Sequence, residues 1–213
     1  MRPPENWRNA RLTLGIAATT AAAWFLAWGL GLSDAAAIIG GFIPARVQGI
    51  APYESFLPVF LTPLSATLVH SGFPHLLFNM LILLFCGRAV ESLIGGRQLA
   101  ILYVVSAYAA AGAQYLAGPT EANPMVGASG AIGGVLGTYS MMFGRNRVKV
   151  ANPTLALWLN ALWLAAGWVV LQVIVGFTFE TRGIRIAVAA HIGGFLVGLL
   201  LAKPLLLLRY RGA

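Results

Sequence analysis

The stretch GASGAIGGVLG at residues 127–137 combines small residues with a single hydroxyl side chain, that of Ser129. Ser129, Gly133 and Gly137 recur every four residues, which places them on one face of a helix. Small residues also recur every four positions in a second segment, as Ala190, Gly194, Gly198 and Ala202. Such stripes let two transmembrane backbones pack closely. We therefore predict that both segments are membrane-spanning helices and that they touch.

The composition places the chain among membrane proteins. Of its 213 residues, 59% are hydrophobic and 9% are charged, whereas an ordinary soluble domain has roughly 25% charged residues. The mean hydropathy of +0.80 agrees with this class. These values argue against a soluble enzyme and against a disordered linker. The single cysteine, Cys86, excludes an intramolecular disulfide and a metal site built on cysteines.

Six segments are long and apolar enough to cross a membrane, which takes about 20 residues in a helix. They are residues 12–32, 75–91, 98–117, 125–143, 155–178 and 185–207. The first follows three arginines but is longer than the apolar run of a secretory signal, so we interpret it as a retained anchor. We predict an all-α membrane protein with one domain, residues 1–213, built as a bundle of six transmembrane helices.

The basic residues indicate the orientation of these spans. Because the number of spans is even, both termini lie on one side of the membrane. Eleven of the 14 Lys and Arg residues fall on that side: Arg2, Arg8, Arg11, Arg88, Arg97, Arg145, Arg147, Lys149, Lys203, Arg209 and Arg211. Basic residues accumulate on the cytoplasmic side, so both termini are predicted to be cytoplasmic. The net charge of +8 is then a topology signal, and we predict no nucleic-acid partner.

The segment between the first two spans, residues 33–74, lies on the external side in this topology. It is rich in aromatic and aliphatic residues, and it is interrupted by Pro44, Pro52, Pro58 and Pro63. It is too apolar for a solvated loop and too interrupted for a spanning helix. We predict a structured loop that lies partly in the membrane interface. A seventh, half-buried span is the alternative.

Strongly polar residues inside predicted spans are functional candidates, and four of them matter most here. They are His75, Asn79, Ser129 and His191. At 1.5 Å per residue from the outer ends of their spans, Ser129 and His191 share a depth of roughly 6–10 Å below the external surface. Because their helices carry the two stripes of small residues, we predict that a ring nitrogen of His191 is within hydrogen-bond reach of the Ser129 hydroxyl.

This pair suggests nucleophilic chemistry. A serine hydroxyl becomes reactive when a base accepts its proton, and histidine suits this role near neutral pH. No Asp or Glu lies in a span near this depth, so the hypothesis is a dyad of Ser129 and His191. Gly127 and Gly130 favour a tight entry into the helix, where unpaired N–H groups can bind an oxyanion.

The remaining polar residues can assist, or they can be structural. His75 and Asn79 lie one turn apart on one helical face and can add side-chain donors for the oxyanion. In the structural interpretation, Ser129 bonds a carbonyl group, the histidines satisfy local backbone groups, and Asn79 joins two helices. We interpret His70, in the external loop, as structural or as shaping the site.

Around these residues the sequence resembles the rhomboid family of intramembrane serine proteases. The family's GxSG pattern is present as GASG at 127–130, its HxxxN pattern as HLLFN at 75–79, and its AHxxG pattern as AHIGG at 190–194. A weaker family pattern is present as Gly87, Glu91, Gly95, Arg97 and Tyr103. The resemblance extends from about residue 60 to residue 202, in the order of the family's spans.

The resemblance implies a role for each residue. Ser129 is similar to the family's nucleophile, His191 to its general base, and His75, Asn79 and the Ser129 N–H to its oxyanion hole. The family cleaves transmembrane or membrane-adjacent segments of other proteins with water from the external side, and it needs no metal or organic cofactor. The implied location is the cell (inner or plasma) membrane, with the active site open to the external or periplasmic side. The implied partners are transmembrane-protein substrates and the lipid bilayer, with no oligomeric state predicted.

The sequence departs from the family pattern in two places. Many members have a Trp-Arg pair in the first loop, where this chain has LTP at 61–63. Some bacterial members have a tyrosine four residues after the nucleophile that stacks on the catalytic histidine. Gly133 occupies that position here, so another group must orient His191.

The resemblance otherwise implies the compact six-span form of bacteria and archaea. It implies a lateral substrate route beside the fifth span, whose tryptophans can line that route or anchor to lipid: Trp158, Trp163 and Trp168.

Two other functions stay open at this point. A catalytically inactive relative would bind transmembrane clients without cutting them, although such proteins usually lose the serine or the histidine, and this chain has both. A small transporter or channel would use the same polar residues to line a pathway. A pathway predicts polar residues across the whole membrane depth, whereas these residues cluster toward one face.

Overall fold

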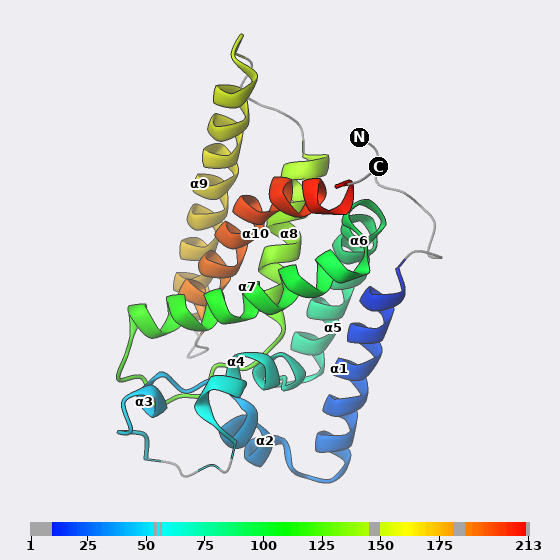
Figure 1. The fold of residues 1–213 in the computed structure, drawn as a ribbon. Coiled ribbons are helices and arrows are strands. Elements are labelled where there is room, and N and C mark those ends of the chain that lie inside the picture. Colours follow the sequence, from blue (N-terminus) through cyan, green and yellow to red (C-terminus); the bar gives the residue numbers. More distant parts are fainter. Residues whose placement is uncertain (1–9, 53–54, 56, 145–149, 181–185, 212–213) are drawn as a thin grey trace.

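The computed structural model describes residues 10–52, 55, 57–144, 150–180 and 186–211. Within these residues the regular structure is helical, apart from one isolated bridge between Phe42 and Met125. The main helices are α1 (Arg11–Gly29), α5 (Phe73–Ile82), α6 (Arg88–Ile94), α7 (Gly96–Ala117), α8 (Ser129–Phe143), α9 (Pro153–Glu180) and α10 (Val188–Arg209). A π-helical segment, η4 (Leu83–Gly87), joins α5 to α6. The predicted all-α fold is confirmed (Figure 1).

Five of the described helices are long and apolar enough to cross a membrane: α1, the joined α5–α6 helix, α7, α9 and α10. This number of spanning helices is typical of a multi-pass membrane protein. The fourth predicted span, residues 125–143, is wrong at its start, because α8 begins at Ser129 and has 15 residues. Such a helix is about 22 Å long, which is shorter than the membrane's hydrocarbon core of roughly 30 Å.

The residues just before α8 are held by the loop between α1 and α5. Phe42 and Met125 exchange two backbone hydrogen bonds, of 3.0 and 2.8 Å. Gly127 follows with a φ of +113°, a conformation that favours glycine. The N–H of Gly127 donates to the carbonyl of Ala66 at 2.9 Å. Extended backbone therefore replaces the first expected turn of the helix, and Ser129 becomes its first residue.

The predicted loop between the first two spans is structured, as the sequence indicated. It contains α2 (Ser33–Gly40), α3 (Pro44–Val47), η2 (Val59–Leu61), α4 (Thr62–Ser65) and η3 (Ala66–Leu68). Each of these helices is too short to span a membrane, so the described part of the loop does not support a seventh span. The short helices gather at the lower end of the molecule in Figure 1. Their position in the membrane interface stays a prediction.

The helices α8 and α10 are in close contact, as the two stripes of small residues predicted. The α8 glycines that meet Gly194 and Gly198 are Gly130 and Gly134, each one position after a member of the predicted stripe. A Cβ atom on Gly194 would overlap the carbonyl oxygen of Gly130. A Cβ atom on Gly198 would overlap the carbonyl oxygen of Gly134 in the same way. The Thr138 hydroxyl donates a hydrogen bond of 2.9 Å to the carbonyl of Gly198. Because only glycine permits this approach, these positions set the distance between the two helices.

The third helix of this core, α7, crosses α8 and α10 (Figure 1) and contacts both. A Cβ atom on Gly193 of α10 would lie 2.5 Å from the Cβ of Ala113 and 2.9 Å from the carbonyl oxygen of Ala109. A Cβ atom on Gly134 of α8 would overlap the Ser106 side chain of α7. Glycines on α8 and α10 therefore allow α7 to approach them as well.

A buried carboxylate attaches α1 to this core. Glu91 in α6 accepts hydrogen bonds from the backbone N–H groups of Leu12 and Thr13, at 2.9 and 2.8 Å. It also accepts one from the Thr13 hydroxyl at 2.7 Å. The first N–H groups of a helix lack partners within the helix and favour a negative charge. Glu91 therefore caps α1 across the bundle.

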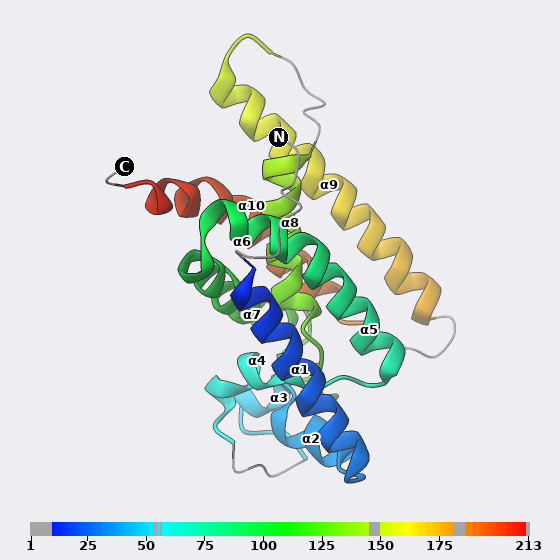
Figure 2. The ribbon, with the colours of Figure 1, turned by 90° about the vertical axis from the view of Figure 1, so that its right-hand side faces the viewer.

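The helix α9 lies at the edge of the bundle (Figure 2). Only 12% of its most apolar window is buried, against 33% for α10 and 39% for α7. Two of its predicted tryptophans, Trp158 and Trp163, are exposed, whereas Trp168 stacks on Phe195 of α10. The buried side chains among those described on this helix are Asn160, Ala161 and Gln172. The attachment of α9 therefore depends on few contacts.

The described basic residues follow the predicted asymmetry. The starts of α1 and α6 and the end of α10 lie away from the loop helices in Figure 1, and they carry Arg11, Arg88 and Arg209. Arg46 lies in α3, within the loop. Arg97, Lys203 and Arg211 are described as well, whereas seven basic residues lie outside the described residues, namely Arg2, Arg8, Arg145, Arg147, Lys149, Arg182 and Arg185. The cytoplasmic location of the termini stays a prediction.

Candidate active site

The Ser129 hydroxyl and the His191 imidazole are in contact. Ser129 is the first residue of α8, and His191 is the fourth residue of α10. The Ser129 Oγ lies 2.7 Å from the His191 Nε2, although the residues are 62 positions apart. This distance is that of a good hydrogen bond. The contact between the glycine faces of α8 and α10 thus brings together the two side chains that the sequence singled out.

Ser129 lies where backbone N–H groups have no partner within the helix. The first hydrogen bond of α8 runs from the N–H of Ile132 to the carbonyl of Ala128, at 2.9 Å. The N–H groups of Ser129 and Gly130 precede this bond and point out of the helix end. The positive end of the helix dipole lies at the same place. A negative charge that forms beside Ser129 would therefore be stabilised.

Gly127 allows a second histidine to lie beside the serine. A Cβ atom on Gly127 would lie 2.7 Å from both Cε1 and Nε2 of His75 and 3.7 Å from the Ser129 Oγ. The His75 ring and the Ser129 hydroxyl therefore border the same point in space. The His75 Nδ1 lies 3.0 Å from the Ser71 hydroxyl, which leaves Nε2 on the side of Gly127.

Asn79 lies one turn after His75 in α5 and is buried. Its side-chain Nδ2 donates to the carbonyl of His75 at 2.8 Å. An amide nitrogen carries two hydrogens, so one donor is left for another acceptor. Among the described residues, no hydrogen bond joins Asn79 to Ser129 directly. The structure thus keeps Asn79 beside His75, and any contact with a reacting group would be made by the second N–H.

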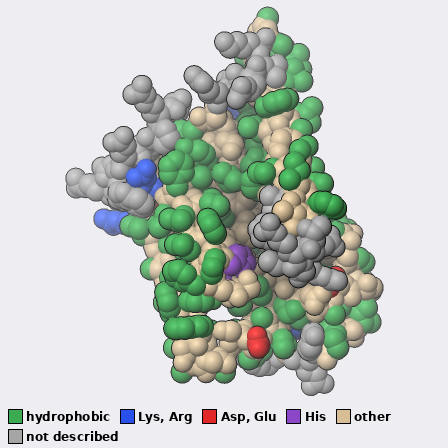
Figure 3. Space-filling model, turned by 180° about the vertical axis from the view of Figure 1, so that it is seen from behind, with side chains coloured by type: hydrophobic (Ala, Val, Ile, Leu, Met, Phe, Trp, Pro, Cys, Tyr) green, Lys and Arg blue, Asp and Glu red, His purple; other side chains and the backbone are tan. Residues whose placement is uncertain are grey.

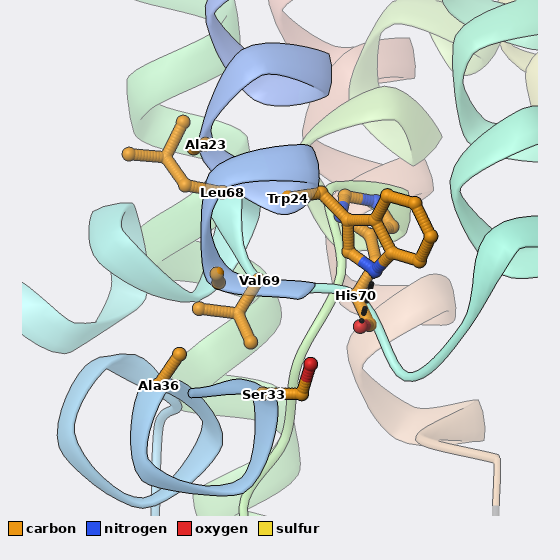
Figure 4. Close-up of a pocket in the computed structure, with 8 residues that line it drawn as sticks. Ala23, Trp24, Ser33, Ala36, Leu68, Val69 and His70 are labelled. Atoms are coloured by element: carbon orange, nitrogen blue, oxygen red, sulfur yellow. Dashed lines mark hydrogen bonds between the residues drawn. The ribbon is translucent and has the colours of Figure 1, made fainter. Parts of the chain in front are cut away.

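His70 contacts the loop that leads to Ser129. Its Nε2 accepts a hydrogen bond of 3.4 Å from the N–H of Ala128, and its ring centre lies 4.9 Å from that of His75. The Trp24 indole donates to the His70 carbonyl at 3.0 Å, at a small apolar pocket between α1 and α2 (Figure 4). Burial, assisted by the nearby His75, lowers the pKa of His70 from 6.5 to about 4. These contacts fit a residue that shapes the site.

The lowered pKa of His70 predicts that the folded protein loses stability as the pH falls from about 6.5 toward 4. Over this range the unfolded chain binds a proton that the folded protein excludes, and a protonated Nε2 can no longer accept from Ala128. Thermal unfolding in detergent at several pH values measures the effect. In His70→Gln, which does not titrate, the melting temperature should depend less on pH than in the wild type. An unchanged pH dependence would contradict the prediction.

Gly130, which was predicted to shape the site, and Gly133, one turn after Ser129, are both needed for packing. A Cβ atom on Gly130 would lie 2.5 Å from the Cβ of Ala110 in α7. One on Gly133 would lie 3.2 Å from the carbonyl oxygen of His191 and 3.3 Å from the backbone nitrogen of Phe195. The backbone of α10 therefore occupies the space that a larger side chain at position 133 would need.

Two residues of α9 contact His191, and neither was among the predicted site residues. The Gln172 Oε1 lies 2.8 Å from the His191 Nδ1. The Trp168 indole donates to the His191 carbonyl at 3.2 Å, and its ring stacks on Phe195 with centres 4.8 Å apart. A signal was present for Gln172, because it is a strongly polar residue in an apolar predicted span. The sequence did not show which residues of α10 lie opposite Gln172.

The site can support nucleophilic chemistry on the surface of the bundle. On the rear face of the molecule, a histidine side chain is visible in a hollow among apolar side chains (Figure 3). The described residues contain no group of three or more His, Cys, Asp or Glu side chains that could hold a metal ion. The arrangement is a hydroxyl bonded to an imidazole, at a helix end that can stabilise an anion.

Comparison with known proteins agrees with the fold and the motifs. The family model of the rhomboid domain matches residues 59–208. A protein named rhomboid protease GlpG, from Pectobacterium atrosepticum, is 29% identical over 186 residues, which cover 81% of this chain and 61% of the relative. RHOMBOID-like protein 5 of Arabidopsis thaliana is 33% identical over 144 residues, which cover 68% of this chain and 43% of the relative.

A third relative, RHOMBOID-like protein 4 of Arabidopsis thaliana, is 34% identical over 151 residues. These cover 70% of this chain and 35% of the relative. The chain thus spans between about one third and three fifths of the length of these relatives. The family model covers most of the chain and includes all the motif residues from His70 to His191. The chain therefore belongs to the rhomboid family.

Proposed function

We propose that this protein is an intramembrane serine protease that cleaves peptide bonds in or near transmembrane segments of other proteins. The observation that carries this proposal is the 2.7 Å contact between the Ser129 Oγ and the His191 Nε2 at the start of α8. A hydroxyl that serves only in packing would bond a carbonyl group, whereas this one meets an imidazole nitrogen. Membership of the rhomboid family supports the same activity.

In the proposed reaction, the His191 Nε2 accepts the proton of the Ser129 hydroxyl while Oγ attacks the scissile carbonyl carbon. The tetrahedral intermediate collapses when the C–N bond breaks, and His191 donates the proton to the leaving amine. This leaves an acyl ester on Ser129. A water molecule then attacks the ester, His191 accepts its proton and returns it to Oγ, and the new carboxyl end is released.

The oxyanion of the intermediate needs donors that are already in place. The N–H of Ser129 at the start of α8 is one, and the His75 side chain beside Gly127 is the second. The free N–H of the Asn79 amide is the third, one turn further along α5. Each donor comes from a packed helix, so their positions change little during the reaction.

The proposed substrates have helix-breaking residues near the scissile bond, because a complete helix shields its carbonyl groups by hydrogen bonding. The distribution of Lys and Arg favours cytoplasmic termini. Since α8 and α10 both start at the opposite end, the site would open to the external or periplasmic side, where water is available. Cleavage is therefore expected near the external end of the substrate helix.

The test is cleavage of a reporter in proteoliposomes. The reporter carries one transmembrane segment with Gly and Pro near its external end, and mass spectrometry locates the cut. Wild type should cut the reporter, and Ser129→Ala and His191→Ala should not. Labelling with a fluorophosphonate gives a second readout: wild type should be labelled on Ser129. A folded wild type that neither cuts nor reacts would refute the protease proposal and favour an inactive relative that binds transmembrane clients.

Asn79→Ala should lower kcat of the reporter reaction by about 100-fold, and by no more than about 1000-fold, because it removes one oxyanion donor. Asn160→Ala in α9 is a matched control. Asn160 is also buried, and its Nδ2 donates to the carbonyl of Ala156 four residues earlier, as Asn79 does to His75. The control should keep kcat within a few-fold of wild type. Similar losses in both variants would assign Asn79 to helix packing.

A further inference from the structure

We infer that Gln172 is a positioning residue that holds the His191 ring with its proton on Nδ1, so that Nε2 can accept the proton of Ser129. This inference deepens the proposed function and depends on it for its catalytic meaning. The geometry points to it directly, because both ring nitrogens of His191 have partners. Nε2 lies 2.7 Å from the Ser129 Oγ, and Nδ1 lies 2.8 Å from the Gln172 Oε1.

The identity of the partner atom decides which nitrogen carries the proton. An amide oxygen has no hydrogen to donate, so a bond between Oε1 and Nδ1 requires the proton on Nδ1. A neutral imidazole has only one such proton, which leaves the lone pair on Nε2 to face the serine hydroxyl. In the other tautomer, Nε2 would donate to Ser129 and could not act as a base. The amide of Gln172 therefore selects the reactive form of His191.

The place of Gln172 on α9 is unusual for that helix. In the part of α9 that follows Ala161, Gln172 is the only buried residue among the side chains described. Burying an amide without a hydrogen-bond partner is unfavourable, and His191 provides that partner. A glutamine in a largely apolar and little-buried helix thus has a specific contact at the candidate dyad.

Two neighbours on the same face of α9 keep Gln172 in register. Trp168, four residues earlier, bonds the His191 carbonyl and stacks on Phe195. Gly176, four residues later, faces Val188: a Cβ atom there would lie 2.6 Å from Val188 Cγ2. Positions 168, 172 and 176 therefore form one stripe against the start of α10. This stripe holds the Gln172 amide at the level of the His191 ring.

Gln172 also provides the side chain that orients His191 in this chain. The α8 residue one turn after Ser129 is Gly133, and the backbone of α10 packs directly on it. No side chain from that position can therefore support the ring. The support comes from α9, a third helix outside the α8–α10 contact. A bond to a neutral amide fixes the tautomer and the ring plane without placing a second charge in the membrane.

The test uses ¹⁵N-histidine-labelled protein in detergent, since the chain contains only three histidines. The His191 resonances are assigned from their loss in His191→Ala. In wild type, the ¹⁵N chemical shifts should show His191 protonated at Nδ1. In Gln172→Leu this preference should be lost, and in Asn160→Leu, which removes another buried amide of α9, it should be kept. An unchanged tautomer in Gln172→Leu would overturn the inference, whether or not the protein cleaves a reporter.

Kinetics then test the catalytic meaning. Gln172→Leu should lower kcat by about 10- to 100-fold, the range expected when a catalytic group loses its orientation, with KM and melting temperature close to those of wild type. Gln172→Glu should restore part of kcat, because a carboxylate also accepts from Nδ1, and should move the acidic limb of the pH–rate profile to higher pH. A loss confined to KM or to stability, with no change in the profile, would make Gln172 a packing residue.

Discussion

Ser129→Ala is expected to lower the rate of reporter cleavage by about 10⁵- to 10⁶-fold. The catalytic residues of a hydrolase act together, so removing the nucleophile alone removes nearly all of the rate that they provide. The oxyanion donors would remain, but there would be no oxygen to form the ester. The structure gives no reason for this variant to unfold. Ser129 is the first residue of α8, where alanine is tolerated, and its described side-chain bond is to His191. Single-turnover cleavage in proteoliposomes measures the loss.

Ser140→Ala is the matched control for this experiment. Ser140 lies on the same helix, at the opposite end from Ser129. The variant should cleave at the wild-type rate and should still react with a fluorophosphonate. If Ser129→Ala retained more than about one hundredth of the wild-type rate in a clean preparation, the nucleophile would lie elsewhere.

Among the substitutions considered, Gly198→Ala is expected to lower the free energy of unfolding the most. A Cβ atom at this position would overlap the carbonyl oxygen of Gly134, which belongs to the backbone of α8 and cannot rotate away. Adding a methyl group to a filled core lowers the free energy of unfolding by about 1–3 kcal/mol, and by more where the backbone must move. Because the backbone must move here, we expect a loss of about 3 kcal/mol. A chain of this length melts roughly 2–4 °C lower per kcal/mol, so the melting temperature should fall by about 6–12 °C.

Gly112→Ala in α7 is the control for Gly198→Ala. A Cβ atom on Gly112 meets nothing within 4 Å, and alanine favours the helix by about 1 kcal/mol over glycine. This variant should therefore be as stable as wild type or slightly more stable. Equal melting temperatures for the two variants would mean that α8 and α10 are further apart than in this structure. Gly198→Ala should also slow cleavage, because separating these helices moves His191 away from Ser129.

The sequence predicted the parts of the fold that depend on local pattern. Apolar runs of about 20 residues identified the helices, and five of them have the length and composition of membrane spans. The fourth span was placed too early, because the apolar run continues through residues 125–128. These residues stay outside the helix because the backbone of Met125 pairs with that of Phe42, more than 80 positions away in sequence. A periodicity argument does not contain such a contact.

The candidate dyad could be predicted because two signals coincided. Small residues every four positions indicated that two helices approach each other, and each of these helices carries a polar residue near the same end. The contacts between glycines explain why that prediction works. Gly194 packs on Gly130 and Gly198 packs on Gly134, and larger side chains at these positions would keep the two helices apart. The role of His70 as an acceptor for Ala128 was left open, because it depends on how the loop folds back.

The amino-acid sequence by itself determined the class of the protein, its long apolar helices, and which helices carry the candidate dyad, because hydrophobicity and residue size act locally along each helix. Only the tertiary structure decided that Ser129 begins its helix and that Gln172 of α9 meets the Nδ1 of His191. Both depend on the rotation and height of one helix relative to another. Those quantities are set by the packing of all the surrounding side chains together, and no single segment encodes them.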